Sequence, residues 1–261
     1  CAKQVPDPEA PPGSLKVDCG DHLVVLPRSF SPVISPFDEQ AVEAALRIKD
    51  AQGGSITVIT LGNNLQRDVV KKPLSMGADE LILLEDSAFE GGDTWSTVTA
   101  LAAAIKKVGD YDLIFCGRQA ADWDAGQVGL GLAEILGLPV VSVAQKVEVM
   151  DGRVRVERVV PDGYEVIESP TPALITVSNE LGEPRYATLK GIMAAAKKQP
   201  TVWKPADLGL DPSQVGEAGR NTKLLRLFQP TKEARCEIVE GETPEEAGTL
   251  LADRLRSAKV L

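Results

Sequence analysis

The most constraining feature of this sequence is a junction near its middle, where an apolar run meets a polar, glycine-rich stretch. The run Leu113 to Cys116 is typical of a buried strand, and the stretch from Gly117 to Gly129 opens a helical pattern reaching about Leu136. This order places free backbone N–H groups and the positive end of a helix at a strand's carboxyl end. Open parallel sheets bind anionic ligands at that edge. The junction therefore predicts a nucleotide site.

Composition limits the classes of function. The chain has 261 residues, 43% of them hydrophobic, which suits one large domain or one domain with an appendage. A net charge of −10 without a basic stripe argues against nucleic-acid binding. The four cysteines form no C-x-x-C motif, which favours a reduced, cytoplasmic location. No apolar run approaches the roughly 20 residues of a membrane span, and no signal peptide is recognised.

Strand and helix patterns alternate along the first half of the chain. The alternation predicts an α/β fold, a parallel sheet with helices on both faces joined by right-handed crossovers. Pro73 is expected to kink or split the second helix. The predicted elements are a strand at 23–26, a helix from Pro36 to about Asp50, a strand at 55–61, a helical segment ending at Met76, a strand at 81–84 and a helix through Val98 and Val108.

The pattern changes after Pro139. Period-two alternation about Asp151-Gly152 predicts an antiparallel hairpin extension, and Asp162-Gly163 predicts a further turn. An apolar strand from Pro172 to Val177 is expected to return to the main sheet, followed by a short Ala-rich helix after Leu189. We expect one domain at 1–198 and a C-terminal arm at 199–261. The arm ends in a helix at about 244–257, capped by Thr243 with Glu246 three residues on.

Two predicted helix starts carry the binding chemistry, and both follow consecutive strands. The hydroxyls of Thr94 and Thr97 suit phosphate oxygens, and Arg118 is a nearby cation that can offset a pyrophosphate. The alternative is that both are simply well-capped helices with small residues for close packing. Carboxylates repel phosphate, so three residues are assigned to helix caps or ribose hydroxyls: Asp93, Asp122 and Asp124.

Catalytic machinery is sparse. The glycines at 126, 129 and 131 do not form G-x-G-x-x-G, and no P-loop motif is present. The only histidine, His22, lies in a polar segment, so we expect no catalytic triad and no metal cluster. These features favour a protein that binds a reactive cofactor over one that reacts through its own side chains.

Five motifs in the same order as in a known family cover nearly the whole chain. They are Cys1 to Asp7, Ser35 to Glu43, Met76 to Asp79, Gly117 to Gly129 and Glu183 to Tyr186. In these motifs the sequence resembles the beta subunit of electron-transferring flavoprotein. The resemblance implies an adenine-nucleotide-binding (HUP-like) fold with three layers. It also implies a heterodimer with an alpha subunit that carries the electron-transferring FAD, the C-terminal arm packing on that subunit.

The resemblance extends to one branch of the family. Beta subunits of simple carriers hold AMP, whereas those of electron-bifurcating members hold a second FAD. Asp93-Thr94-x-x-Thr97, Arg118 and Val128 resemble the bifurcating type, since simple carriers usually have Lys and Thr at the last two positions. Trp123 departs from this pattern, because a small residue is usual there, and Ser35 stands where Asn is common. A second FAD is the first choice and AMP the alternative.

The resemblance also implies residues and partners. The pocket flavin would take hydride from NADH and send electrons to a low-potential acceptor such as ferredoxin or flavodoxin, and through the alpha-subunit FAD to an acyl-CoA or related dehydrogenase. A simple carrier would take electrons from such dehydrogenases. An ATP-using enzyme of the same fold is less favoured, because Lys3 to Asp7 stands where its Gly-Ser motif is expected.

The resemblance also implies site residues: Tyr186, Leu189 and Ile192 match the loop that docks on the dehydrogenase. The predicted cofactor-binding residues are Cys1, Ser35, Pro36, Phe37, Asp38, Leu61, Asp93, Thr94, Thr97, Gly117, Arg118, Gln119, Ala120, Asp122, Trp123, Asp124, Ala125, Gly126, Gln127 and Val128.

Overall fold

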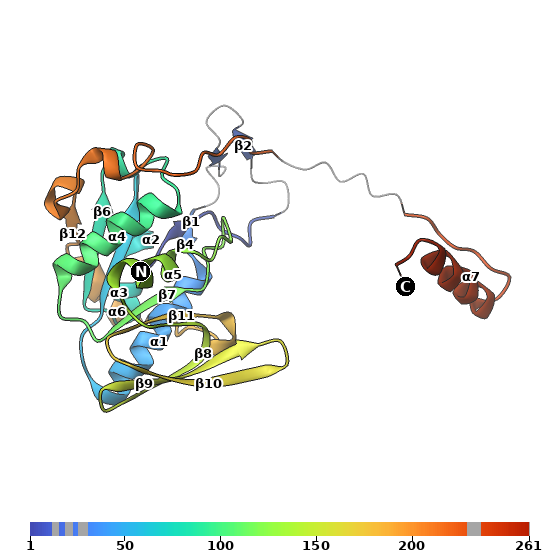
Figure 1. Cartoon of the computed structure of the whole chain (residues 1–261), viewed down its shortest axis with the longest axis horizontal. Helices are drawn as coiled ribbons and strands as arrows, with labels where there is room; N and C mark the ends of the chain where they lie inside the picture. The colour runs from blue at the N-terminus through green and yellow to red at the C-terminus, as the bar shows by residue number, and fades with distance from the viewer. Residues whose placement is uncertain (12–15, 19–22, 26–30, 229–235, 261) are drawn as a thin grey trace. The chain divides into compact units, whose positions relative to one another are not determined.

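In the computed structural model, helices pack on both faces of parallel strands (Figure 1). The structure describes residues 1–11, 16–18, 23–25, 31–228 and 236–260. Contacts divide the chain into two units, Cys1–Leu227 and Phe228–Leu261, which are described separately. Leu26, the last residue of the first predicted strand, and His22 lie outside the described residues.

The parallel strands form two ladders. One has the order β12-β6-β5, and the other contains the parallel series β7-β11-β8. The first residues of the chain link the ladders, because Ala2 N donates to Ile59 O at 3.0 Å and Cys1 N donates to Phe115 O at 2.7 Å. The predicted parallel arrangement is confirmed. The strand bounds are β5 Thr57–Gly62, β6 Glu80–Glu85, β7 Leu113–Gly117, β8 Val140–Met150, β11 Ala173–Val177 and β12 Thr201–Trp203.

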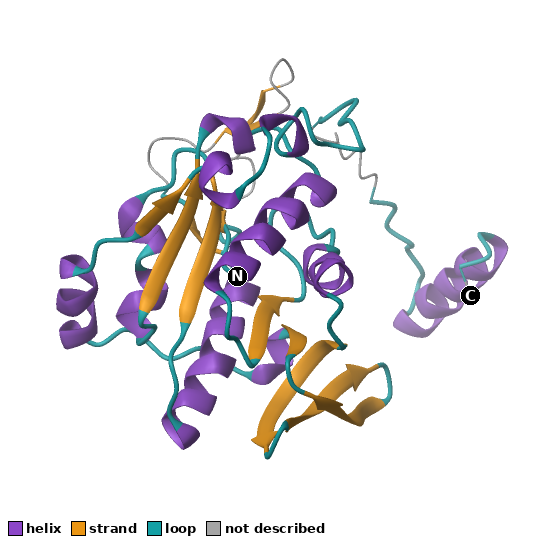
Figure 2. Cartoon of the chain, turned by 60° about the vertical axis from the view of Figure 1, so that its left-hand side comes forward, coloured by secondary structure: helices purple, strands orange, loops and turns teal. Residues whose placement is uncertain are grey.

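Alternate side chains of β6 enter two different cores. Leu81 and Leu83 pack in the cluster that includes residues of α2, α3 and α6, whereas Ile82 and Leu84 pack in the cluster with α4 and α5. This alternation is what a strand covered on both faces requires. Figure 2 shows helices flanking the strands. The helix bounds are α2 Arg67–Val70, α3 Lys72–Met76, α4 Thr94–Val108, α5 Val128–Leu136 and α6 Leu189–Lys197.

Helix α1, Pro36–Gln52, places the first half of the predicted site. Proline stands at its first turn, where a missing N–H costs nothing, and Asp38 and Glu39 lie near the positive end of the helix dipole. Its buried Ala41 and Ala44 pack against the ladder of β7, β11 and β8. The next predicted helix is split before Pro73 into α2 and α3, as its sequence predicts.

The antiparallel extension forms as predicted. Strands β8, β9 (Arg153–Val160) and β10 (Gly163–Pro170) pair in order, and Gly152 takes a φ of 65° in the first turn. Val154 and Val156 of β9 are fully buried on one face. The remaining short elements are β1 Gln4–Val5, β2 Lys16–Asp18, β3 Leu23–Val25, β4 Val33–Ile34, and the 3₁₀ turns η1 Ser87–Phe89, η2 Asn179–Leu181, η3 Pro205–Leu208 and η4 Pro212–Gln214.

Residues 199–227 belong to the first unit, so the division falls after Leu227 and not at residue 198. Strand β12 pairs in parallel with β6, and Val215 is fully buried in the cluster beneath α4. The high Pro, Gly and Asp content of residues 199–223 predicts an irregular segment, and the few apolar residues that pack in it, such as Val215, give no periodic pattern in the sequence. The segment is therefore not an extended arm.

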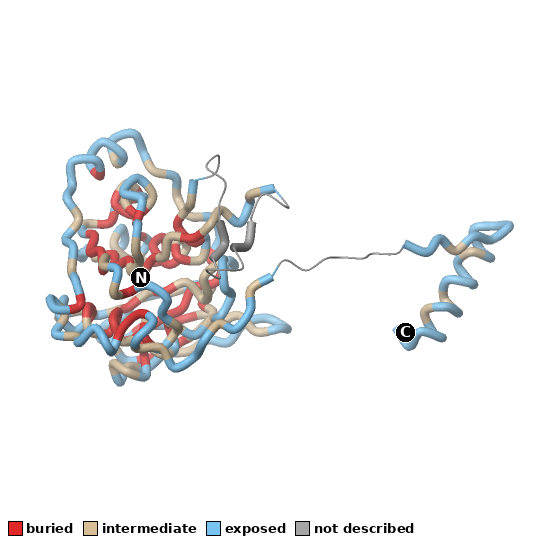
Figure 3. The backbone as a smooth tube through the Cα atoms, turned by 90° about the horizontal axis from the view of Figure 1, so that it is seen from above, coloured by how far each residue is buried: buried red, intermediate tan, exposed pale blue. Residues whose placement is uncertain are grey.

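The described part of the second unit contains one helix, α7, Pro244–Ser257. Thr243 Oγ1 accepts a hydrogen bond from Glu246 N at 3.2 Å, and the Glu246 carboxylate accepts one from Glu242 N at 2.8 Å, which confirms the predicted cap. No residue of α7 is buried (Figure 3). Within the described residues, no helix combines the length and apolarity needed to cross a membrane.

Candidate functional site

The predicted site forms where β7 ends against the start of α1. Gly117 N donates to one oxygen of Asp38 at 3.0 Å, and Lys3 N donates to the other oxygen at 2.8 Å. A Cβ at Gly117 would lie 2.6 Å from that carboxylate and 2.8 Å from the Phe37 backbone, so only glycine fits. The Asp38 carboxylate therefore links the end of β7 to the backbone just before β1 through two hydrogen bonds.

Asp38 is 8% exposed. Burial raises its pKa to about 6, while the N–H groups of Lys3 and Gly117 act in the opposite direction. Both oxygens already accept backbone hydrogen bonds. Asp38 is thus suited to positioning the site and not to proton transfer with a substrate.

Arg118 is the cation of this site. Its guanidinium carbon lies 5.4 Å from the centre of the Phe37 ring, and its Nη1 donates to Ser178 Oγ at 3.5 Å. No salt bridge joins it to a carboxylate among the residues that the structure describes. The hydrogen bond from the Ser178 hydroxyl and, more weakly, the positive charge of Arg118 hold the pKa of Glu180 below its usual range. Arg118 is therefore held in place with its charge available to an anion.

The two predicted helix starts meet. Thr94 Oγ1 donates to Gln127 Oε1 at 3.1 Å, which joins the first residue of α4 to the N-cap of α5. Thr97 lies half-buried one turn along α4. The sequence prediction that both starts open at one edge is confirmed by this bond.

The three aspartates have different roles. Asp93 caps α4, since its carboxylate accepts from Ser96 N at 3.0 Å and from Asn221 N and Thr222 N at 2.8 Å. Burial alone would raise its pKa, but these donors lower it to about 2. Asp122 and Asp124 are not helix caps. The Asp122 carboxylate pairs with Lys3 Nζ at 2.7 Å, and Asp124 accepts from Gln119 Nε2 at 2.8 Å.

The remaining predicted residues line the same loop and its surroundings. Ser35 is buried, and its hydroxyl accepts from Ala121 N at 3.4 Å. Trp123 is 55% exposed, so its indole faces solvent in this chain. Pro36 begins α1. In the loop after β7, Ala120 O accepts a hydrogen bond from Asp124 N at 2.9 Å, Ala125 is exposed, and Gly126 has a φ of 65°. Three partly buried side chains pack against the core cluster of α4: Cys1, Leu61 and Val128.

Sequence reasoning missed two contributors. Lys3 lies in a quoted motif, but nothing in its spacing shows that it reaches Asp122 across the sheet. Ser178, which contacts Arg118, directly follows β11, the neighbour of β7. The rule that strand ends meet at one edge could have found it.

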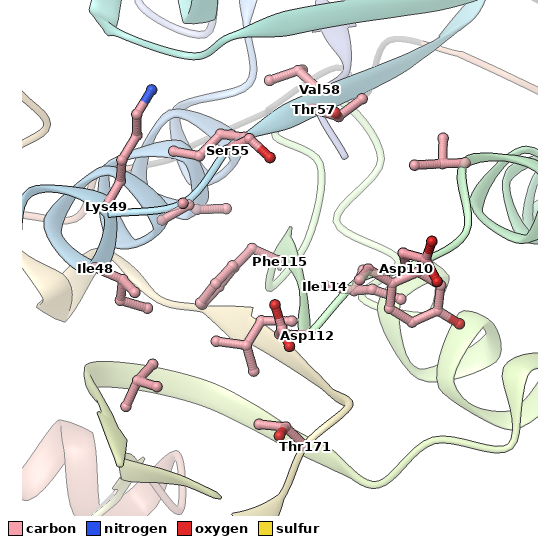
Figure 4. A pocket seen from close by; sticks show the side chains of 18 of the residues that line it. Ile48, Lys49, Ser55, Thr57, Val58, Asp110, Asp112, Ile114, Phe115 and Thr171 are labelled. Atoms are coloured by element: carbon pink, nitrogen blue, oxygen red, sulfur yellow. The ribbon is translucent and has the colours of Figure 1, made fainter. Parts of the chain in front are cut away.

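A cavity of about 770 Å³ lies elsewhere, between the beginnings of β5 and β7 (Figure 4). Thr57 and Val58 of β5 face Ile114 and Phe115 of β7 across it. It is at the amino ends of these strands, opposite the predicted site, and shares only Cys1 with the predicted residues. Among the described residues, no cluster of three or more His, Cys, Asp or Glu side chains is arranged to hold a metal ion.

An exposed apolar patch occupies the other predicted functional region. Tyr186 is 89% exposed, Leu189 75%, Ile192 51% and Met193 58%, and these four residues are called the docking patch below. Thr188 caps α6 by accepting from Gly191 N at 3.0 Å. The structure therefore displays the predicted docking residues on one short, capped helix and its approach.

Fold and site together define a class: an α/β protein with a cation, helix starts and a glycine turn at the carboxyl edge of parallel strands, which suits an anionic nucleotide. The family model for the electron transfer flavoprotein domain matches residues 23–208. The chain belongs to the electron transfer flavoprotein family and corresponds to its beta subunit.

Three curated relatives illustrate the similarity. The electron transfer flavoprotein subunit beta of Thermoanaerobacterium thermosaccharolyticum is 40% identical, over 99% of this chain and 97% of its own. The caffeyl-CoA reductase-Etf complex subunit CarD of Acetobacterium woodii is 38% identical, over 100% and 98%. The acryloyl-CoA reductase electron transfer subunit gamma of Anaerotignum propionicum is 34% identical, over 100% and 98%.

Proposed function

We propose that this chain is the beta subunit of a heterodimeric electron transfer flavoprotein and that its site binds a second FAD used in electron bifurcation. The observation that carries the proposal is Arg118, a positioned guanidinium without a carboxylate salt bridge among the described residues. A planar guanidinium can contact two adjacent phosphates at once, as the diphosphate of FAD requires, whereas an ammonium acts as a single point charge.

The residues present fit such a group. Arg118 and the backbone N–H groups in the first turn of α5 would hold the diphosphate, and Asp122 or Asp124 would accept from ribose hydroxyls. When bound, FAD would supply hydride acceptance from NADH and single-electron transfer to the alpha-subunit FAD and to an acceptor such as ferredoxin or flavodoxin. The chain's own residues bind and orient, since the buried Asp38 is committed to backbone donors.

Partner enzymes are inferred from the docking patch and the relatives. The names of two relatives place them with reductases of CoA thioesters, caffeyl-CoA and acryloyl-CoA. Exposed apolar side chains on a capped helix suit protein docking. We therefore assign the docking patch as the binding site for an acyl-CoA dehydrogenase or a related enzyme.

Leu189→Ala should weaken electron transfer to that enzyme and leave flavin content intact; loss of flavin would argue for a structural role.

The second unit suits contact with the alpha subunit. Helix α7 buries no residue within its own unit, and Leu250 and Leu251 are exposed on it. A helix with an uncovered apolar stripe gains stability by packing on a partner. We assign that partner as the alpha subunit.

AMP in place of FAD is the second candidate. It is favoured by the bond from Thr94 Oγ1 to Gln127 Oε1, because this hydroxyl then has no proton left to donate to the additional phosphate of FAD. The test is to purify the complex with its alpha subunit, denature it and quantify the released cofactors. Two FAD per heterodimer would support bifurcation, whereas one FAD and one AMP would refute it and support a simple carrier.

A further inference from the structure

A buried carboxylate on α1 fixes the chain just before the docking patch. The Glu43 side chain is 6% exposed. Its oxygens accept from Arg185 Nε at 2.8 Å, Arg185 N at 3.2 Å, Arg185 Nη2 at 3.3 Å and Arg47 Nε at 2.9 Å. Burial alone would raise the pKa of Glu43, but the hydrogen bonds from Arg185 and Arg47 hold it below its usual range. A buried carboxylate is stable only when it is paired in this way.

Arg185 is bound by more than Glu43. Glu43, Arg47 and Asp50 are spaced four and three residues apart, which places them on one face of α1. Arg185 Nη2 contacts the Asp50 carboxylate at 2.8 Å, and Arg47 Nη1 donates to Leu181 O at 3.1 Å. The segment before the docking patch, residues 181–185, is therefore bound to α1 at both of its ends.

The helix that carries the docking patch, α6, is also fixed in place. A Cβ at Gly191 would lie 2.3 Å from the carbonyl oxygen of Ser75, so the backbone of α6 rests directly on α3. Ala195 of α6 is buried in the cluster that contains Leu74 of α3. The docking patch thus exposes its side chains while the backbone on both sides of it is held.

We propose that Arg185 is a positioning residue for docking: its clamp by Glu43 and Asp50 holds the docking patch in its binding conformation before the partner arrives. This inference rests on the docking role proposed above. A segment that is ordered in advance does not lose that conformational entropy on binding. Lysine cannot reproduce the clamp, because it lacks the planar fork that meets two carboxylates.

The test uses the complete heterodimer with its bound cofactors and a purified short-chain acyl-CoA dehydrogenase as electron-transfer partner. Arg185→Gln should raise the KM for the dehydrogenase by roughly tenfold, the expected effect of freeing one or two side chains that must be ordered again. The kcat and the cofactor content should not change. Arg185→Lys should give an intermediate KM. The double variant Glu43→Gln with Arg185→Gln should have a KM no higher than that of Arg185→Gln alone, because the contact between Glu43 and Arg185 is already lost in the single variant.

A second readout reports on the free complex. Amide hydrogen exchange over residues 182–190 should accelerate in Arg185→Gln without any dehydrogenase present. Arg153→Ala is the matched control, because Arg153 is a surface arginine of β9 whose partner Glu168 lies at 3.5 Å. It should leave both KM and exchange unchanged.

The outcomes separate the inference from the docking role. If Leu189→Ala raises the KM while Arg185→Gln changes neither KM nor exchange, the clamp is refuted and docking stands. If Leu189→Ala leaves the KM unchanged, the docking role fails and the inference with it. Loss of cofactor in both Arg185→Gln and Arg185→Lys would make Arg185 a general structural residue and overturn the proposal.

Discussion

Replacing Asp38 by asparagine should change how the stability of the fold depends on pH. The folded-state pKa of Asp38 is raised from 3.8 to about 6 by burial, so the native chain binds more protons than the unfolded chain between these values. Stability contributed by this group is therefore fully present below about pH 4 and is lost as pH rises through about 6. A rise of about two pKa units corresponds to about 3 kcal/mol.

Asparagine is nearly isosteric with the protonated carboxyl and cannot ionise. The free energy of unfolding of Asp38→Asn minus that of the wild type should therefore be about 2 kcal/mol more favourable to the variant at pH 7.5 than at about pH 4.5. The measurement is urea unfolding of both proteins at the two pH values.

Function should move in the opposite direction to stability. The side-chain amide introduced by Asp38→Asn would offer only one acceptor to the two backbone donors, Lys3 N and Gly117 N, so the turn that carries Arg118 loses one of its ties. Nucleotide retention by the heterodimer should fall. If the stability difference between variant and wild type is the same at both pH values, Asp38 does not titrate in this range and the reasoning is wrong.

Three more substitutions test the site. Gly117→Ala should destabilise the fold by about 1–3 kcal/mol in urea, since its Cβ has no space; a neutral result would mean that α1 can shift away. Arg118→Ala should lower nucleotide content in the purified heterodimer without changing the melting temperature of the apoprotein, and unchanged content would remove Arg118 from the binding role. The pKa of Asp93 is lowered to about 2, so its stabilisation, about 1–2 kcal/mol after solvent screening, is present above its unfolded pKa and is lost as pH falls through about 2. Asp93→Asn should therefore be less stable than the wild type at neutral pH and close to it near the folded-state pKa, and a constant deficit would contradict this.

The sequence was most informative where a local rule determines structure. Pro36 with acidic residues behind it begins α1, and Asp151-Gly152 makes the hairpin turn. These features depend on neighbouring residues alone. Strand ends and helix starts also placed Gly117, Arg118 and Thr94 at one edge, because the parallel topology follows from the alternation of elements.

Features that depend on distant partners were not predictable. Lys3 and Asp122 are 119 positions apart and meet only after the sheet has formed. Strand β12 has three residues in a Pro- and Gly-rich segment, and only its register with β6 shows that it is a strand. The clamp of Arg185 by Glu43 spans 142 positions and has no local signal, since a buried Glu on α1 resembles any solvated helix residue in sequence.

The cap of α4 has a consequence for how the chain matures during synthesis. One carboxylate oxygen of Asp93 can accept a hydrogen bond from Ser96 N as soon as that residue is made. The other oxygen accepts from Asn221 N, which lies 128 positions further along the chain and is synthesised later. At roughly 5–20 residues per second, the ribosome needs on the order of ten seconds to supply that partner. The cap of α4 is thus completed only after residue 221 has been added to the chain. Ribosome-bound chains stalled before residue 221 should therefore exchange the amides of residues 93–96 faster than the released protein.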